Sequence, residues 1–146
     1  GTVVCDPYDS QEAGFEPLKL KADVVTCSSN HPGHHFISAV KGDPFIIDSP
    51  GEYEINNVFI NGYRSGETDG VKNTIFVIEY NGLFVAHLGN LNRIPSLSEI
   101  ETYGTIHVLL IPVGGGGALP PFVLLQKPYT PAELRARIAE ALSTGA

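Results

Sequence analysis

The sequence predicts a single α/β (α+β) domain, residues 1–146, in which short β-strands dominate and helices are few. Hydrophobic residues make up 42% of the chain and charged residues only 17%, a balance typical of a folded core rather than of disorder. The 16 glycines and 11 prolines indicate many short elements joined by tight turns. Between these turns lie apolar, β-branched runs of strand length.

The predicted strands lie at residues 2–5, 23–27, 44–48, 58–62, 73–80, 83–89, 106–113 and 121–125. Asn81-Gly82 separates two of them by two residues, which predicts a tight antiparallel hairpin. The strand at 73–80 carries apolar residues on both alternating faces. Such a strand needs cover on both sides, so a second sheet or a helix layer is expected on each face.

Three helices are predicted, at residues 34–40, 96–104 and 130–145. Ser96 and Glu99 form the pattern of a capping box at the start of the second helix. Thr130 and Glu133 repeat that pattern at the start of the third, which should dock on the body through a narrow apolar stripe.

The formal net charge is −7 and the pI about 5.1. This acidity argues against sequence-independent binding to nucleic acid and against an anionic membrane surface, since both need clustered Lys and Arg. No apolar run approaches the roughly 20 residues that span a bilayer. Cys5 and Cys27 lie in apolar runs and are expected to be buried free thiols, which fits a cytoplasmic location.

The stretch "VVTCSSNHPGHH" (24–35) contains His31, His34 and His35 on a turn after a predicted strand. Neutral imidazoles on one turn are a moderate signal for a zinc site. Without a carboxylate or thiolate at clear ligand spacing, the same residues are equally typical of a polar surface loop. The histidines alone leave both interpretations open.

The order of "TCSSNHPGHH", "DSPGEYE", "HLG" and "LLIPVGG" resembles the metallo-β-lactamase superfamily, in the branch of small metal-dependent hydrolases related to sugar-acid lactonases. The resemblance covers most of residues 2–117. It implies an αββα sandwich of two mixed sheets with helices outside. It also implies two zinc ions at one sheet edge, where a bridging hydroxide attacks an ester, lactone or amide carbonyl.

Transferred to this sequence, the ligand pattern is mostly replaced. His31 and His34 match, but other residues stand where the family has a His, an Asp, the bridging Asp and the last His: Ser29, Gly33, Asn90 and Pro128. Further candidate ligands are His35, Glu67 and His87. The resemblance therefore implies a non-catalytic protein with no favoured cofactor. The alternative is a metal-dependent hydrolase with a rearranged mononuclear zinc site.

The usual N-terminal hairpin of the family is lacking, so a homo-oligomer that covers the exposed sheet edge is expected. Five other polar residues carry expectations. Asp6 is interpreted as a turn residue or an acid at the site mouth, and Glu52 and Tyr53 as turn residues. Arg64 is expected in solvent or facing an anionic ligand, and His107 as a strand residue with a satisfied ring nitrogen. The sequence does not identify a small-molecule ligand.

Overall fold

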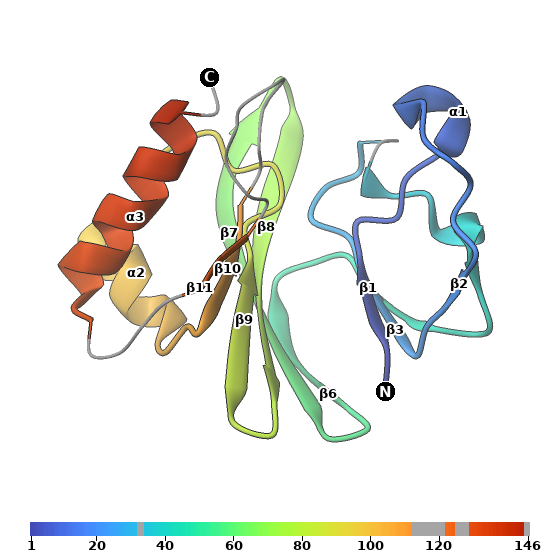
Figure 1. Ribbon diagram of the computed structural model, residues 1–146, viewed down its shortest axis with the longest axis horizontal. Coiled ribbons are helices and arrows are strands. Elements are labelled where there is room, and N and C mark those ends of the chain that lie inside the picture. The colour runs from blue at the N-terminus through green and yellow to red at the C-terminus, as the bar shows by residue number, and fades with distance from the viewer. Residues whose placement is uncertain (32–33, 112–121, 125–128, 145–146) are drawn as a thin grey trace.

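Two β-sheets packed face to face form the centre of the molecule, and two helices cover the outer face of the larger sheet (Figure 1). This computed structural model describes residues 1–31, 34–111, 122–124 and 129–144. The mixed architecture with few helices confirms the predicted fold class. Within the described residues, no helix is long and apolar enough to cross a membrane.

The larger sheet has six strands in the order β11-β10-β9-β8-β7-β6. Their bounds are β6 Gly51–Ile55, β7 Val58–Thr68, β8 Val71–Tyr80, β9 Leu83–His87, β10 Val108–Leu110 and β11 Phe122–Leu124. Only β9 and β10 run parallel, and the other neighbours are antiparallel. This sheet is therefore mixed, as expected.

The smaller sheet contains β1 (Val3–Cys5), β3 (Val24–Thr26) and β5 (Phe45–Ile47), which are all parallel in the order β1-β3-β5. It differs in this from the mixed sheet that was expected. Each connection between its strands is long enough to cross over and return the chain in the same direction. Within these connections, β2 (Leu20–Lys21) and β4 (Val40–Lys41) pair as a small parallel ribbon.

Helix α2 (Leu97–Tyr103) begins at the predicted capping box, because Ser96 and Glu99 bond reciprocally through side chain and backbone. Helix α3 (Pro131–Thr144) begins with the same exchange between Thr130 and Glu133. A short helix α1 (Ser10–Ala13) was not predicted. The predicted helix at 34–40 shrinks to the 3₁₀ turn η2 (Ile37–Ala39), whose N-cap, Phe36, has no side chain that can cap it.

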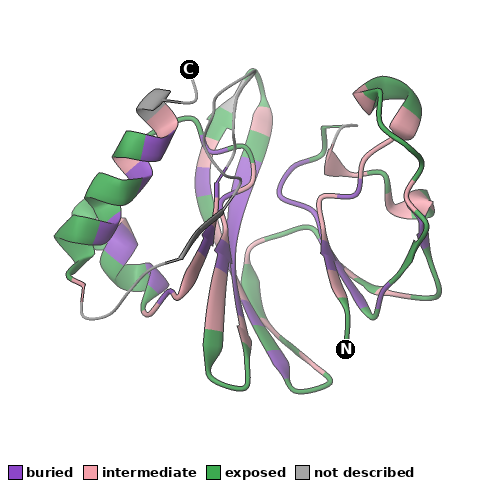
Figure 2. Ribbon diagram, viewed as in Figure 1, coloured by how far each residue is buried: buried purple, intermediate pink, exposed green. Residues whose placement is uncertain are grey.

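The core consists of three apolar layers (Figure 2). The first lies between the larger sheet and helices α2 and α3, the second between the two sheets, and the third behind β1 and β3. Strand β8 serves two layers. Ile75 and Val77 belong to the first, while Phe76 and Ile78 belong to the second. The expectation that this strand is covered on both faces is confirmed.

The hairpin at Asn81-Gly82 is confirmed, since both residues have positive φ and Tyr80 pairs with Leu83. The strand predicted at 58–62 continues to Thr68 and turns at a second hairpin. Glu52 and Tyr53, expected to serve a turn, both lie in strand β6, paired with β7. The Tyr53 side chain nevertheless serves the bend before the strand, because its hydroxyl donates to the Ser49 carbonyl at 2.9 Å. Backbone pairing with a neighbour places both residues in a strand although their alternation is mostly polar.

The two cysteines are free. Cys27 is buried and Cys5 is half-buried, and their burial raises the pKa of Cys5 to about 11 and that of Cys27 to about 12. Both therefore behave as packed thiols rather than as reactive thiolates.

Candidate functional site

Polar side chains gather where the parallel strands of the smaller sheet end. Asp6 follows β1, Ser28 lies just beyond β3, and Asp48 follows β5. Carboxyl ends of parallel strands meet at one edge of a sheet, the usual place for ligands in open α/β sheets. The larger sheet adds His87, the last residue of β9, from across the second core layer.

Asp6 is the centre of this edge. Its carboxylate accepts hydrogen bonds from the Ser28 backbone N–H at 2.7 Å and from the Ser28 hydroxyl at 2.5 Å. Nδ1 of His34 lies 3.0 Å from the same carboxylate, whose side chain is only 9% exposed. Asp6 thus joins the end of β1 to the loop after β3. These partners lie 22 and 28 residues away, so the side chain is not that of a local turn residue; its position at this edge agrees with the other interpretation, an acid at the site mouth.

The Asp6–His34 contact is an ion pair when His34 is protonated. Burial alone would raise the pKa of Asp6, but the hydrogen bonds from His34 and Ser28, together with the nearby His87, lower it below 3.8. The hydrogen bond to Asp6 raises the pKa of His34 above 6.5, against the opposing effect of burial. Each partner therefore stabilises the charged form of the other.

His87 lies beside this pair but makes a different contribution. Burial lowers its pKa, Asp6 opposes that change and His34 adds to it, so the neutral ring is favoured. Its Nδ1 atom is buried and has no hydrogen-bond partner among the described residues. A buried ring nitrogen without a hydrogen bond is unusual, since most buried polar groups are paired.

The other candidate ligands are spread over the edge. His31 is exposed, and its ring centroid lies 5.9 Å from that of His34. Nε2 of His35 lies 3.8 Å from Asp48 Oδ2, too far for a strong hydrogen bond. Glu67 is exposed on β7. Gly33 and Pro128 lie outside the described residues.

A buried amide next to the site was not anticipated from the sequence. Asn73 donates to the Ser65 hydroxyl at 2.7 Å and to the Leu88 carbonyl at 3.1 Å, and its side-chain oxygen accepts from the Asn90 backbone at 2.9 Å. The sequence feature that could have indicated this amide is the polar Asn73 at the start of the apolar run "NTIFVIEY". This amide fixes the loop that carries Asn90, whose own side chain is exposed.

A cavity of about 390 Å³ opens at this edge, between the loop after β3 and the hairpin of β7 and β8. Its polar lining residues are Ser28, Ser29, Asn30, His31, Asp48, Arg64 and Lys72. Two cationic side chains thus face a cavity at the edge where the family holds its metal ions.

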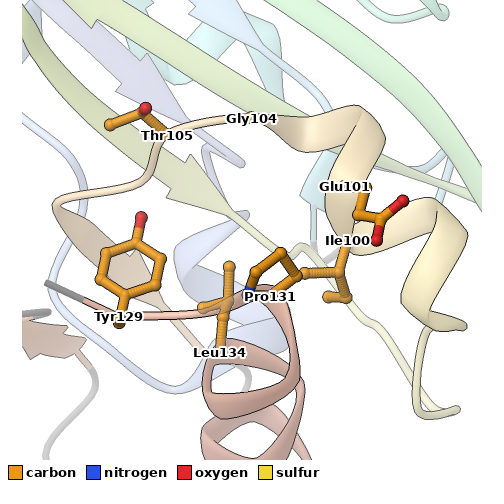
Figure 3. A pocket seen from close by; sticks show the side chains of 7 residues that line it. All are labelled: Ile100, Glu101, Gly104, Thr105, Tyr129, Pro131 and Leu134. Atoms are coloured by element: carbon orange, nitrogen blue, oxygen red, sulfur yellow. The ribbon is translucent and has the colours of Figure 1, made fainter.

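A second cavity, of about 450 Å³, lies elsewhere, between helices α2 and α3 (Figure 3). Ile100, Pro131 and Leu134 form its apolar wall. The Tyr129 hydroxyl at its margin is already bonded to the backbone of Ile106. Glu101 and Thr105 also line it, but no hydrogen bond joins them among the described residues, so the polar edge is the better candidate site.

His107 lies outside both cavities. Its Nδ1 accepts a hydrogen bond from the Phe84 backbone at 3.0 Å. The prediction that a ring nitrogen of His107 is hydrogen-bonded is confirmed. His107 itself lies one residue before the start of β10.

The donor set does not fit the two zinc ions that the family implies. Asp6 is occupied by Ser28 and His34, and the Ser29 hydroxyl accepts from the His31 backbone at 3.3 Å. Asn90 offers a neutral amide where a bridging carboxylate is needed. In the described ranges, no three His, Cys, Asp or Glu residues lie close enough together to hold a metal ion.

Comparisons with known proteins agree with the fold. The sequence model of the beta-lactamase superfamily domain matches residues 1–138. A solved structure from Thermotoga maritima, a candidate Zn-dependent hydrolase of the metallo-β-lactamase superfamily, is 35% identical with a TM-score of 0.65. The match covers 97% of this chain and 61% of that one, so this chain spans about three fifths of its length. Curated proteins give no match. The chain belongs to the metallo-β-lactamase superfamily.

Proposed function

We propose that this chain is a non-catalytic member of the superfamily that binds a small molecule at the polar edge without a metal ion. The donor set at this edge carries this proposal. The Nδ1 atom of His34 is held by Asp6, so only its Nε2 atom is left to ligate a metal ion, as one donor of the three or four that zinc needs. Among the residues that the structure describes, no three His, Cys, Asp or Glu side chains lie close enough together to complete the set.

The replacements at the other ligand positions support the same conclusion. Ser29 and Asn90 supply neutral oxygens where a His and an Asp would complete the donor set. A zinc hydrolase needs three or four donors and a metal-bound water of lowered pKa. The residues at this edge provide hydroxyl, amide and cationic groups instead, which suit the binding of a ligand more than its hydrolysis.

Metal analysis tests the proposal directly. The protein is purified without chelator, its zinc content is measured, and hydrolysis of a panel of esters and lactones is assayed with and without added zinc. We expect substoichiometric zinc and no turnover above background. Stoichiometric zinc together with turnover would refute the proposal.

A variant with restored ligands provides the matched control. The triple variant Ser29→His, Gly33→Asp, Asn90→Asp returns three family ligands to their positions. We expect it to bind zinc more tightly than the natural sequence in a calorimetric titration. Equal affinity of the two proteins would show that the replaced positions do not limit metal binding.

One observation favours the alternative, a hydrolase with a rearranged mononuclear site. The buried Nδ1 of His87 has no hydrogen-bond partner among the described residues, and its ring lies near His34. If a metal binds here, His87→Ala and His34→Ala should each abolish the binding. Full occupancy in both variants would remove these histidines as ligands.

A further inference from the structure

The cavity at the polar edge contains two cations from neighbouring strands. Arg64 lies on β7 and Lys72 on β8. Arg64 pairs in register with Thr74, and its guanidinium Nη1 lies 3.4 Å from the Thr74 hydroxyl, which helps to fix the side chain. The chain has only nine Lys and Arg residues and a net charge of −7. Two of its scarce cations thus face the same cavity.

The charges of both residues are available to a ligand. Neither Arg64 nor Lys72 forms an ion pair with any residue in the described part of the chain. The guanidinium has a planar fork of N–H donors that matches a carboxylate or phosphate, while the ammonium acts as a point charge. Together they can contact one oxyanion in the cavity that both line.

Neutral donors complete the lining. The Ser29 hydroxyl accepts from the His31 backbone, which leaves its own proton available to a ligand oxygen. The Asn30 side chain adds an amide donor. A volume of about 390 Å³ suits a small metabolite rather than a polymer.

Asp48 makes the charge distribution of the cavity uneven. Its carboxylate also lines the cavity and repels an anion, and Nε2 of His35 lies 3.8 Å from its Oδ2 atom. A ligand is therefore oriented with its oxyanion toward Arg64 and Lys72 and a hydroxyl or ammonium donor toward Asp48.

We propose that this cavity binds a small molecule carrying a carboxylate or phosphate group, with Arg64 and Lys72 holding that group in place of metal ions. The inference rests on the proposed function, because it assigns a ligand class to the same metal-free edge. The positive charge that metal ions supply elsewhere in the family comes here from two side chains.

The test uses the chelator-treated protein and follows backbone amide chemical shifts during titration with inorganic phosphate or acetate at constant ionic strength. We expect saturable shifts at the cavity residues with at least one of the two anions. Whichever of the two anions binds more tightly indicates whether the ligand carries a phosphate or a carboxylate group. Arg64→Gln and Lys72→Gln should each weaken binding roughly tenfold, because each removes a charge-assisted contact.

Arg137→Gln is the matched control, since Arg137 is an exposed arginine of α3. It should leave the affinity unchanged, and Asp48→Asn should tighten binding. Equal weakening by Arg137→Gln, or no saturation with either anion, would overturn the inference while the non-catalytic assignment stands. Saturation that requires zinc and is accompanied by ester hydrolysis would instead overturn the proposed function.

Discussion

At the scale of single residues, Asp6 does more than its position after a strand suggests. It has a φ of 50°, its backbone N–H donates to the Thr26 carbonyl, and its carboxylate binds Ser28 and His34. A carboxylate that is 9% exposed and accepts several hydrogen bonds is stable only when all of its partners are in place. Asp6 therefore holds the loop after β3 in the shape that forms the cavity.

Asp6→Asn keeps the shape of the side chain and removes its charge. We expect a loss of about 1–3 kcal/mol in the free energy of unfolding, because the hydrogen bond from His34 loses its ionic character. Urea unfolding near pH 6 measures this loss. Asp43→Asn, at an exposed carboxylate, should change stability by less than about 0.5 kcal/mol. Equal effects in the two variants would show that the Asp6 network contributes nothing.

The pH dependence of the pair can be measured with His34→Gln. The raised pKa of His34 means that its contribution is complete below pH 6.5 and is lost as the pH rises through that pKa. The lowered pKa of Asp6 means that its contribution is complete above pH 3.8 and is lost on further acidification. The stability gap between natural sequence and variant should be largest between these values and smaller at pH 9. A gap that is constant with pH would contradict the ion pair.

Gly89 lies where two parts of the chain approach each other closely, and a substitution there tests how tightly they are held. It has a φ of 61°, and a Cβ added there would lie 2.5 Å from Ser28 Cβ and 2.6 Å from Asn73 Oδ1. Gly89→Ala should therefore cost about 3 kcal/mol or more, from backbone strain plus the clash. Gly82→Ala has the same kind of φ with nothing within 4 Å, so it should cost only about 1–2 kcal/mol. Equal losses in urea unfolding would show that these parts separate easily.

The residues of the site could be predicted only in part. His34 and Asp6 were each singled out from the sequence, but their contact was not predicted, because it depends on β1 and β3 being adjacent strands. Asn73 stands at the start of an apolar run, and its partners come from two separate segments, β7 and the loop after β9. Such contacts follow from strand order, which hydrophobic periodicity does not determine.

At the scale of elements, the clearest sequence signals were the helix caps. The helix predicted at 96–104 appears as Leu97–Tyr103, with the capping box intact. Strand β6 was missed because "GEYEI" follows Pro50 and has only a weak apolar alternation. The second half of β7 was missed for the same reason, since its residues pair mainly through the backbone. Local side-chain chemistry predicts caps well, whereas strand pairing depends on the neighbour.

The start of α2 offers an element-scale prediction. Glu99 binds both Arg93 and the Ser96 backbone N–H, and the Arg93 side chain also donates to the Ser65 carbonyl. The hydrogen bond from Arg93, only partly offset by desolvation, lowers the pKa of Glu99 to about 2. Glu99→Gln keeps the capping bond and loses the ion pair, so it should cost less than about 1 kcal/mol at neutral pH.

The contribution of this ion pair should be complete above pH 4.5 and should vanish as the pH falls toward 2. Ser96→Ala, by contrast, should cost about 1 kcal/mol through loss of the cap, and this cost should remain across the same range. Urea unfolding of both variants between pH 2 and pH 7 separates the two contributions. An unchanged Glu99→Gln gap at low pH would refute the assignment.

At the scale of the whole molecule, self-association stays a prediction. Strand β1 is an edge of the smaller sheet and β6 an edge of the larger one, with no further strand beside either in the described part of the chain. Edge strands present unpaired backbone groups, although the exposed Glu52 and Glu54 of β6 oppose edge-to-edge pairing. Light scattering at micromolar concentration should give a mass above 15.6 kDa if the β1 edge is covered by a second copy. A monomeric mass would count against it.

The second apolar layer holds the two sheets together. Phe76 lies in that layer and is fully buried, and its ring packs so close to Gly62 that a Cβ added there would lie 3.0 Å from it. Phe59, on the neighbouring strand, is 44% exposed. Phe76→Ala should therefore cost about 3–5 kcal/mol, because it opens a cavity between the sheets. Phe59→Ala removes the same atoms from a partly solvated surface and should cost less than about 1.5 kcal/mol. Because Phe76 pairs with His87 of the polar edge, its loss should also broaden the amide signals of Ser28 and His34. Similar stability losses in both variants would mean that the two sheets do not depend on each other.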